Sequence, residues 1–199
     1  MLDSTIVRLQ QNDPTLTKLN LCSQKIGDRE AIVLAKALAK NTALLALNLT
    51  CNQIGEIGAS ALAEALKVNA SLSVLILSDN QVGDEGARAL ASALGVNRTL
   101  TKLTLYTNHI GDSGASALAE ALKANGTLTA LNLNSNQLTA RSMHLFAAAL
   151  ESNDALASLY VEGNPIGDDG ARVLNERIDP VLVQNWHNPV YSGAYSGWQ

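Results

Sequence analysis

The stretch of sequence that decides the fold is residues 44–69, which read LLALNLTCNQIGEIGASALAEALKVN. A closely similar string starts at six leucines that follow one another every 28 residues, without insertion or deletion: Leu16, Leu44, Leu72, Leu100, Leu128 and Leu156. A repeat of this length is typical of a solenoid, in which each unit acquires a core only by stacking on its neighbours. The sequence therefore predicts one elongated domain.

Each unit combines the signals of a short strand and of a helix. Leu47 and Leu49 lie two residues apart, and this spacing predicts a strand whose leucines point to one side. In residues 56–68 the apolar positions recur at helical spacing, which predicts a helix with one buried stripe. We expect the acidic residue Glu56 to be the N-cap of this helix and Asn69 to be its C-cap.

Strands that alternate with helices at a constant interval predict a parallel sheet joined by right-handed crossovers. Neighbouring strands lie about 4.8 Å apart, whereas packed helices need roughly 8–10 Å between their axes. This mismatch bends the stack, with strands on the concave side and helices on the convex side. The predicted fold class is therefore α/β, a horseshoe arc of six repeats.

One polar column accompanies the leucines, and it consists of Gln24, Asn52, Asn80, Asn108, Asn136 and Asn164. An amide that points inward at a bend can satisfy backbone groups that would otherwise be buried without hydrogen-bond partners. We therefore expect these residues to be structural. In the fifth repeat Met143 and Phe146 replace smaller residues, which indicates local repacking or, alternatively, a pocket on the outer face.

The repeat resembles the ribonuclease-inhibitor-like class of leucine-rich repeat, which also forms the C-terminal arrays of NOD-like receptors and parts of some bacterial effectors. The resemblance covers residues 14–179. It implies a protein-binding module that uses the concave sheet and its rims, and several members of the class inhibit enzymes by covering the active site. It implies no catalytic residues.

The two ends of the chain depart from the repeat. Residues 1–13 are predicted to form an N-terminal capping helix, and residues 180–199 a C-terminal cap or aromatic tail. Residues 181–199 contain no charged Asp, Glu, Lys or Arg, but they hold four large aromatic residues: Trp186, Tyr191, Tyr195 and Trp198. Three interpretations stay open, namely a cap on the last repeat, a segment that docks a partner, and a disordered or targeting tail.

The composition excludes several classes of function. A net charge of −4 and a pI near 5.3 argue against binding to nucleic acid. No apolar run approaches the roughly 18 residues that a membrane span needs, and the first residues do not read as a secretory signal peptide. The two cysteines, Cys22 and Cys51, are expected to be reduced. A cytoplasmic protein is the natural expectation, or one delivered into a host cell if it is a bacterial effector.

Few residues could carry out chemistry. The three histidines, His109, His144 and His187, are scattered and match no metal-binding spacing. The glycine-rich strings that open the helices, such as residues 83–86, lack the lysine and the spacing of a phosphate-binding loop. We therefore expect no enzyme, no cofactor and no metal site.

The strand residues that flank the inward leucines should face the concave side. Most of them are small or polar, and the bulky exceptions are the expected partner-binding anchors: Val74, Ile76, Tyr106 and Tyr160. Further candidates are polar or charged residues on the same face or its rim: Asp79, Lys102, His109 and Glu162. The predicted function is to bind another protein with these residues or with the aromatic tail, and the free chain is expected to be monomeric. The competing interpretations are an unspecialised solvent-facing surface, and the sensor array of a receptor or effector.

Overall fold

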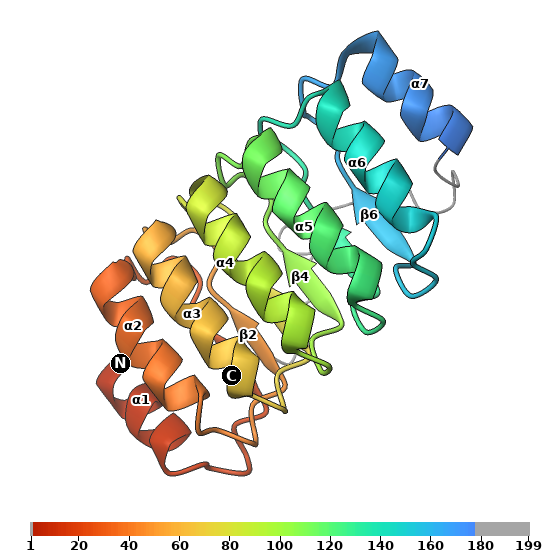
Figure 1. Ribbon diagram of the computed structural model, residues 1–199. Coiled ribbons are helices and arrows are strands. Elements are labelled where there is room, and N and C mark those ends of the chain that lie inside the picture. The colour runs from red at the N-terminus through yellow and green to blue at the C-terminus, as the bar shows by residue number, and fades with distance from the viewer. Residues whose placement is uncertain (1, 178–199) are drawn as a thin grey trace.

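The computed structural model describes residues 2–177 as one stack of alternating strands and helices (Figure 1). The strands are β1 (Lys18–Asn20), β2 (Ala46–Asn48), β3 (Val74–Ile76), β4 (Lys102–Thr104), β5 (Ala130–Asn132) and β6 (Ser158–Tyr160). The helices are α1 (Leu2–Gln10), α2 (Asp28–Leu38), α3 (Glu56–Val68), α4 (Gly83–Val96), α5 (Asp112–Ala124), α6 (Ala140–Leu150) and α7 (Gly167–Arg177).

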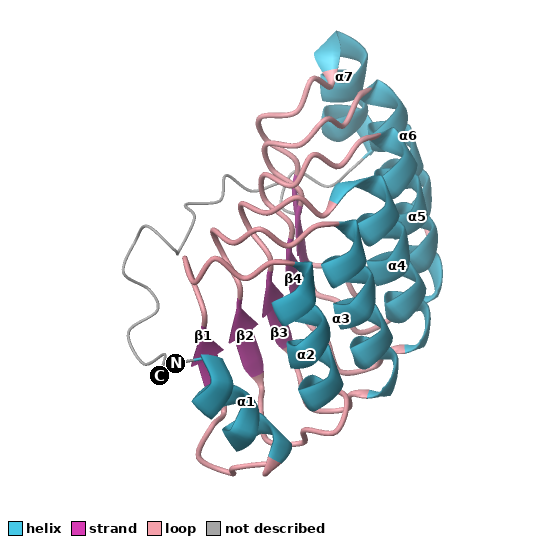
Figure 2. Cartoon of the chain, turned by 90° about the vertical axis from the view of Figure 1, so that its left-hand side faces the viewer, coloured by secondary structure: helices cyan, strands magenta, loops and turns pink. Residues whose placement is uncertain are grey.

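The strands form one parallel six-stranded sheet in the order of the sequence, from β1 to β6. Its register places equivalent residues of successive repeats side by side, as with Leu47 beside Leu75. Helices α2–α7 form a second layer on one side of the sheet, and the stack curves with the strands on its inner side (Figure 2). The α/β arc predicted from the 28-residue period is thus confirmed.

The core is a narrow layer of leucine and alanine between the sheet and the helices. Leu47 and Leu75 of the strands are fully buried, and so are Ala59 and Ala63 of α3. Small alanine side chains on the helix flanks let neighbouring helices approach closely. Each repeat therefore contributes the same thin slice to one continuous core.

The prediction for the start of the helices was wrong by one residue. Gly55, not Glu56, is the N-cap of α3, and it has no side chain with which to cap. The helix start is capped from the preceding repeat, where Oδ1 of Asp28 accepts hydrogen bonds from the backbone N–H groups of Gly55 at 2.8 Å and Gly58 at 2.9 Å. A Cβ at residue 58 would lie 2.7 Å from that same oxygen, so only glycine fits there. The acidic residue of one repeat thus ties it to the next.

The asparagine column has the structural role that was expected of it. Oδ1 of Asn52 accepts from the backbone N–H groups of Gln24 at 3.1 Å and Ile26 at 2.9 Å. Its Nδ2 donates to the carbonyl groups of Leu21 at 2.9 Å and Leu49 at 2.8 Å. Because these partners belong to two repeats, the amide joins consecutive turns of the solenoid. Gln24, in the first repeat, is exposed and departs from the pattern.

The fifth repeat keeps its helix despite its altered sequence. Thr139 is the N-cap of α6, and its side chain accepts a hydrogen bond from the backbone N–H of Arg141. Met143 and Phe146 are both fully buried. The larger side chains therefore fill the core at this layer, which agrees with the interpretation of local repacking.

The N-terminal end of the stack is closed by α1. Ile6 and Leu9 of this helix are buried and belong to the continuous core. The proposed C-terminal cap, residues 180–199, lies outside the residues that the structure describes.

Candidate interaction surface

The concave face consists of strand side chains that alternate with the inward leucines. In β3, Leu75 points into the core, so Val74 and Ile76 on either side of it point away from the helices. The register places Val74 beside Lys102 of β4, and Ile76 beside Thr104. Residues that lie 28 positions apart in the sequence thus become lateral neighbours on one surface.

The charged and polar candidates of this face are the most accessible ones. Lys102, His109 and Glu162 are exposed, and Tyr106 is half-buried. Three of these residues, Lys102, Tyr106 and His109, belong to the fourth repeat, on β4 and the loop that follows it. Glu162 lies in the corresponding loop after β6. The accessible candidates therefore gather in the middle of the arc, with Glu162 towards its C-terminal end.

The apolar candidates are less accessible than the sequence suggested. Val74 is half-buried, whereas Ile76 and Tyr160 are buried, with 3% and 8% of their surfaces exposed. Tyr160 pairs with Asn132 in the register of β5 and β6. Sequence periodicity finds the face on which a side chain lies, but it does not report how much of that side chain solvent reaches.

Hydrogen bonds with two asparagine side chains fix the backbone of the loop that carries Tyr106 and His109. Asn108 is fully buried, and its Nδ2 donates to the carbonyl of Tyr106 at 3.0 Å. Oδ1 of Asn136, in the next repeat, accepts from the backbone N–H groups of Asn108 and Ile110, both at 3.0 Å. His109 adopts a left-handed backbone conformation, with φ of 58°. The two exposed side chains are therefore presented from a fixed backbone, which limits the entropy lost when a partner binds.

Asp79 has a neighbour that the sequence did not reveal. The Sγ atom of Cys51, one repeat earlier, lies 3.9 Å from Oδ2 of Asp79 and donates a weak hydrogen bond to it. Burial raises the pKa of the Asp79 carboxyl, and the bond from the thiol offsets part of that rise. Burial also raises the pKa of the Cys51 thiol, as does the charge of Asp79. Both cysteines are free thiols, in agreement with the expectation from composition.

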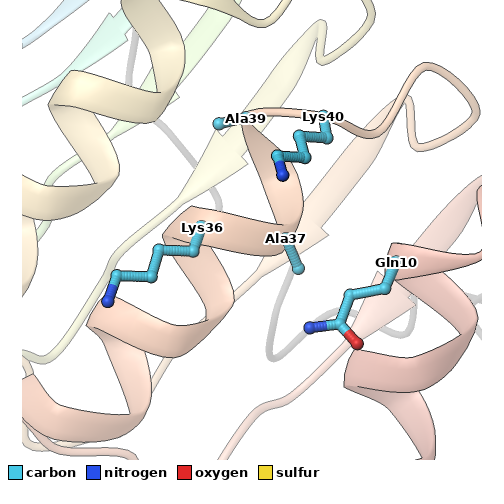
Figure 3. Close-up of a pocket in the computed structure, with 5 residues that line it drawn as sticks. All are labelled: Gln10, Lys36, Ala37, Ala39 and Lys40. Carbon is cyan, nitrogen blue, oxygen red and sulfur yellow. The ribbon is translucent and has the colours of Figure 1, made fainter.

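Among the described residues, the titratable side chains do not form a metal-binding cluster. Within residues 2–177, no group of three or more His, Cys, Asp or Glu side chains could hold a metal ion. His144, on the convex side, contacts Asp169 through Nε2 at 2.9 Å. Elsewhere a groove of about 570 Å³ lies between α1 and α2, lined by Gln10, Lys36, Ala37, Ala39 and Lys40 (Figure 3). The Lys36 side chain points away from Gln10 in this view, so the groove gathers no converging set of charges.

Trp186, Tyr191, Tyr195 and Trp198 lie outside the described residues. Of the helices in the part of the chain that is described, none has the length and apolar character needed to traverse a bilayer.

Comparison with known proteins gives matches to repeat families over most of the chain. Residues 1–108 match the model of the TMOD/LMOD leucine-rich domain. Residues 124–146 and 155–174 match the general model of a leucine-rich repeat. No curated protein sequence matches the chain significantly.

Two solved structures share the arc. Actin-binding site 2 of Leiomodin-1 is similar over 89% of this chain and 87% of its own length, with 22% sequence identity and a TM-score of 0.56. The tropomodulin C-terminal domain of Caenorhabditis elegans is similar over 76% of this chain and 92% of its own length, with 20% identity and a TM-score of 0.65. At these identities the likeness concerns the fold.

Proposed function

The chain belongs to the TMOD/LMOD leucine-rich domain family, and from this premise we propose that it is a binding module whose partner protein is actin. The observation that carries the proposal is the family match over residues 1–108. The likeness to a structure described as actin-binding site 2 of Leiomodin-1 supports the same partner. The family is non-enzymatic, so recognition is the activity to be explained.

The family match is more specific than the resemblance to the ribonuclease-inhibitor-like class that the repeat indicated. The ribonuclease-inhibitor-like class stays valid as the wider group to which this type of repeat is related. The TMOD/LMOD match replaces the bacterial-effector alternative. The expectation of delivery into a host cell, which depended on that alternative, is given up with it. We propose instead that the chain acts in the cytoplasm, where its two free thiols would stay reduced.

We place the centre of the binding surface on the fourth repeat. Lys102 offers an exposed cation, Tyr106 a half-buried aromatic ring, and His109 an exposed group at the rim. Aromatic side chains near the centre of an interface, surrounded by polar contacts, carry much of the binding free energy in known complexes. Val74 and Asp79 adjoin this centre from the third repeat. Val74 pairs with Lys102, and the backbone N–H of Asp79 donates a hydrogen bond to the carbonyl of Tyr106 at 2.9 Å.

The dimensions of the concave face suit a protein partner. Six strands at a spacing of about 4.8 Å give a sheet roughly 24 Å wide. A stable interface buries about 800 Å² on each partner, so the sheet reaches this size when its rims contribute. A surface of this kind would cover the bound region of the partner and block it sterically.

Binding of purified actin to the full chain tests the proposal. We expect the chain to sediment with actin filaments or to comigrate with unpolymerised actin in gel filtration. In the controls, the chain should not sediment with tubulin filaments, and it should not sediment when no filaments are present. Comigration with one form of actin also identifies which form is recognised. Failure to associate with both forms, for a chain that shows cooperative melting, would refute actin as the partner.

A further inference from the structure

The first strand of the sheet has an open edge. β1 pairs with β2 along one side, and no described strand lies along its other side (Figure 2). In a parallel ladder, alternate residues direct both of their backbone groups towards the same neighbour. The carbonyl of Thr17 and the N–H of Leu21 both bond to the second repeat, so Lys18 and Asn20 direct their backbone groups towards the open side. Both of these residues are exposed.

The interior strands show how these two positions bond to a neighbouring strand. Ala46 and Asn48 are the equivalents of Lys18 and Asn20 one repeat later. The N–H of Ala46 donates to a carbonyl of the preceding repeat at 3.1 Å, and the carbonyl of Asn48 accepts from an N–H of the preceding repeat at 2.8 Å. The same groups of β1 have no described strand before them. Proteins add an extended peptide as a further strand at an unpaired edge of this kind.

The open edge is short and has definite ends. Before the strand, the N–H of Thr17 donates to the carbonyl of Thr15 at 3.1 Å. After it, the N–H of Cys22 donates to Oδ1 of Asn20 at 3.1 Å, and the carbonyl of Cys22 accepts from Nε2 of Gln24 at 3.2 Å. An added segment therefore pairs with the 3 residues of β1. Because each backbone hydrogen bond contributes only modestly to binding in water, side chains must supply part of the affinity.

The charges around this edge are positive. Residues 14–27 contain Lys18 and Lys25 but no Asp or Glu. Both lysines are exposed, and among the described residues neither has an ion-pair partner. Asp13, which lies just before this stretch, is already paired with Arg8 at 2.8 Å. A segment that carries carboxylates is therefore complementary in charge to the edge.

We propose that the open edge of β1 binds an extended acidic segment of a partner protein, which joins the sheet as a further parallel strand. Side chains of the added strand alternate between the concave side and the side of the helices. Those on the concave side lie beside Lys18 and are acidic. Those on the other side continue the row of Leu19 and are apolar. This site is separate from the fourth repeat, and it does not depend on actin as the partner.

Binding of a designed peptide to the full chain tests the proposal. The probe is a short fluorescein-labelled peptide of alternating valine and glutamate, and its control carries lysine in place of each glutamate. We expect fluorescence anisotropy to show saturable binding of the acidic probe and no binding of the basic one. Equal binding of the two peptides overturns the proposal, and so does a failure of both to bind.

Two substitutions at one residue separate the backbone from the charge. Lys18→Gln removes the charge and keeps the N–H, so it should raise the Kd of the acidic probe severalfold. Lys18→Pro also removes the N–H, at an edge position that can accommodate proline, and should raise the Kd about tenfold further. The matched control is Lys36→Gln at an exposed position of the convex helix α2, which should leave the Kd unchanged. Equal Kd values for Lys18→Gln and Lys18→Pro would contradict strand pairing.

Amide hydrogen exchange in the unmodified chain keeps the test independent of any folding defect in the variants. By NMR, the amide protons of Lys18 and Asn20 should exchange fast in the free chain and slowly when the acidic probe saturates it. The amide of Leu21, which bonds to the second repeat in both states, is the internal control and should stay protected. Binding of the probe without protection of Lys18 and Asn20 overturns the proposal. Protection of both amides in the free chain overturns it as well, because the edge is then already occupied.

Discussion

Val74 and Lys102 stand side by side on the concave face, paired in the parallel register of β3 and β4. Val74 is half-buried and Lys102 is exposed, so apolar area adjoins a cation on a long flexible stem. Interfaces commonly combine a desolvated apolar centre with a polar rim. The pair therefore marks the place where we expect the partner to make its central contacts.

Lys102→Met tests the contribution of the cation, because methionine keeps most of the apolar stem and removes the charge. We expect the Kd for actin to rise about threefold to tenfold, which corresponds to roughly 0.7–1.4 kcal/mol. Surface plasmon resonance at two salt concentrations measures this change. Lys40→Met, at an exposed lysine in the turn that follows α2, is the matched control and should bind like the unmodified chain. Equal Kd values for the two variants would exclude Lys102 from the interface.

Asn52→Ala should lower the free energy of unfolding by about 3 kcal/mol, since it leaves several buried backbone groups without partners. The amide of Asn52 bonds to both its own and the preceding repeat, with Ile26 N–H at 2.9 Å and Leu49 carbonyl at 2.8 Å. Gln24→Ala removes an exposed residue of the same column and should lower the free energy of unfolding by less than about 0.5 kcal/mol. Urea denaturation compares the two, and equal losses would contradict the role assigned to the column.

Asp79→Asn should raise the melting temperature at pH 7. Burial lifts the pKa of Asp79 above its usual 3.8, so the ionised carboxylate destabilises the native state at neutral pH. As the pH falls through the raised pKa towards 3.8, native Asp79 takes up its proton and the advantage of the variant shrinks. Thermal melts between pH 3 and pH 7 follow this difference. A variant that melts lower than the unmodified chain at pH 7 would contradict the account.

Asp112→Asn should have the opposite effect. Burial favours a higher pKa, but hydrogen bonds from the hydroxyls of Ser142 and Thr139 and from the N–H of Thr139 outweigh it and hold the pKa of Asp112 below 3.8. The stabilisation is complete above pH 3.8 and is lost as the pH falls through the lowered pKa. We therefore expect the variant to melt lower at pH 7 and to match the unmodified chain at the acid end. An equal difference at every pH would show that charge is not the cause.

Most of the fold could be predicted from the sequence because one pattern recurs six times. The spacing of Leu47 and Leu49 was enough to predict a strand, and the 28-residue interval determines which strands pair. The cap of the helices was missed because the carboxylate that caps α3 comes from Asp28, a full repeat earlier. Contacts between repeats depend on the stacking geometry, which a single unit does not contain.

The face on which the candidate residues lie was predictable from the sequence, but their accessibility was not. Alternation about Leu75 correctly placed Val74 and Ile76 on the face opposite the helices. It could not indicate that Ile76 is 3% exposed while Lys102, one strand away, is exposed. Nor could it find the contact of Cys51 with Asp79, because neither residue belongs to a recognisable motif.

The Kd for actin of Tyr106→Ala, compared with that of Ile57→Ala, tests the central claim most directly. Tyr106 is half-buried at the proposed centre of the concave site, and Ile57 is a 65% exposed apolar residue on the convex helix α3. We predict that Tyr106→Ala weakens binding about tenfold or more, or ~1.4 kcal/mol, while Ile57→Ala leaves the Kd unchanged. Loss of affinity in Ile57→Ala with full affinity in Tyr106→Ala would contradict the account and move the site to the helical face.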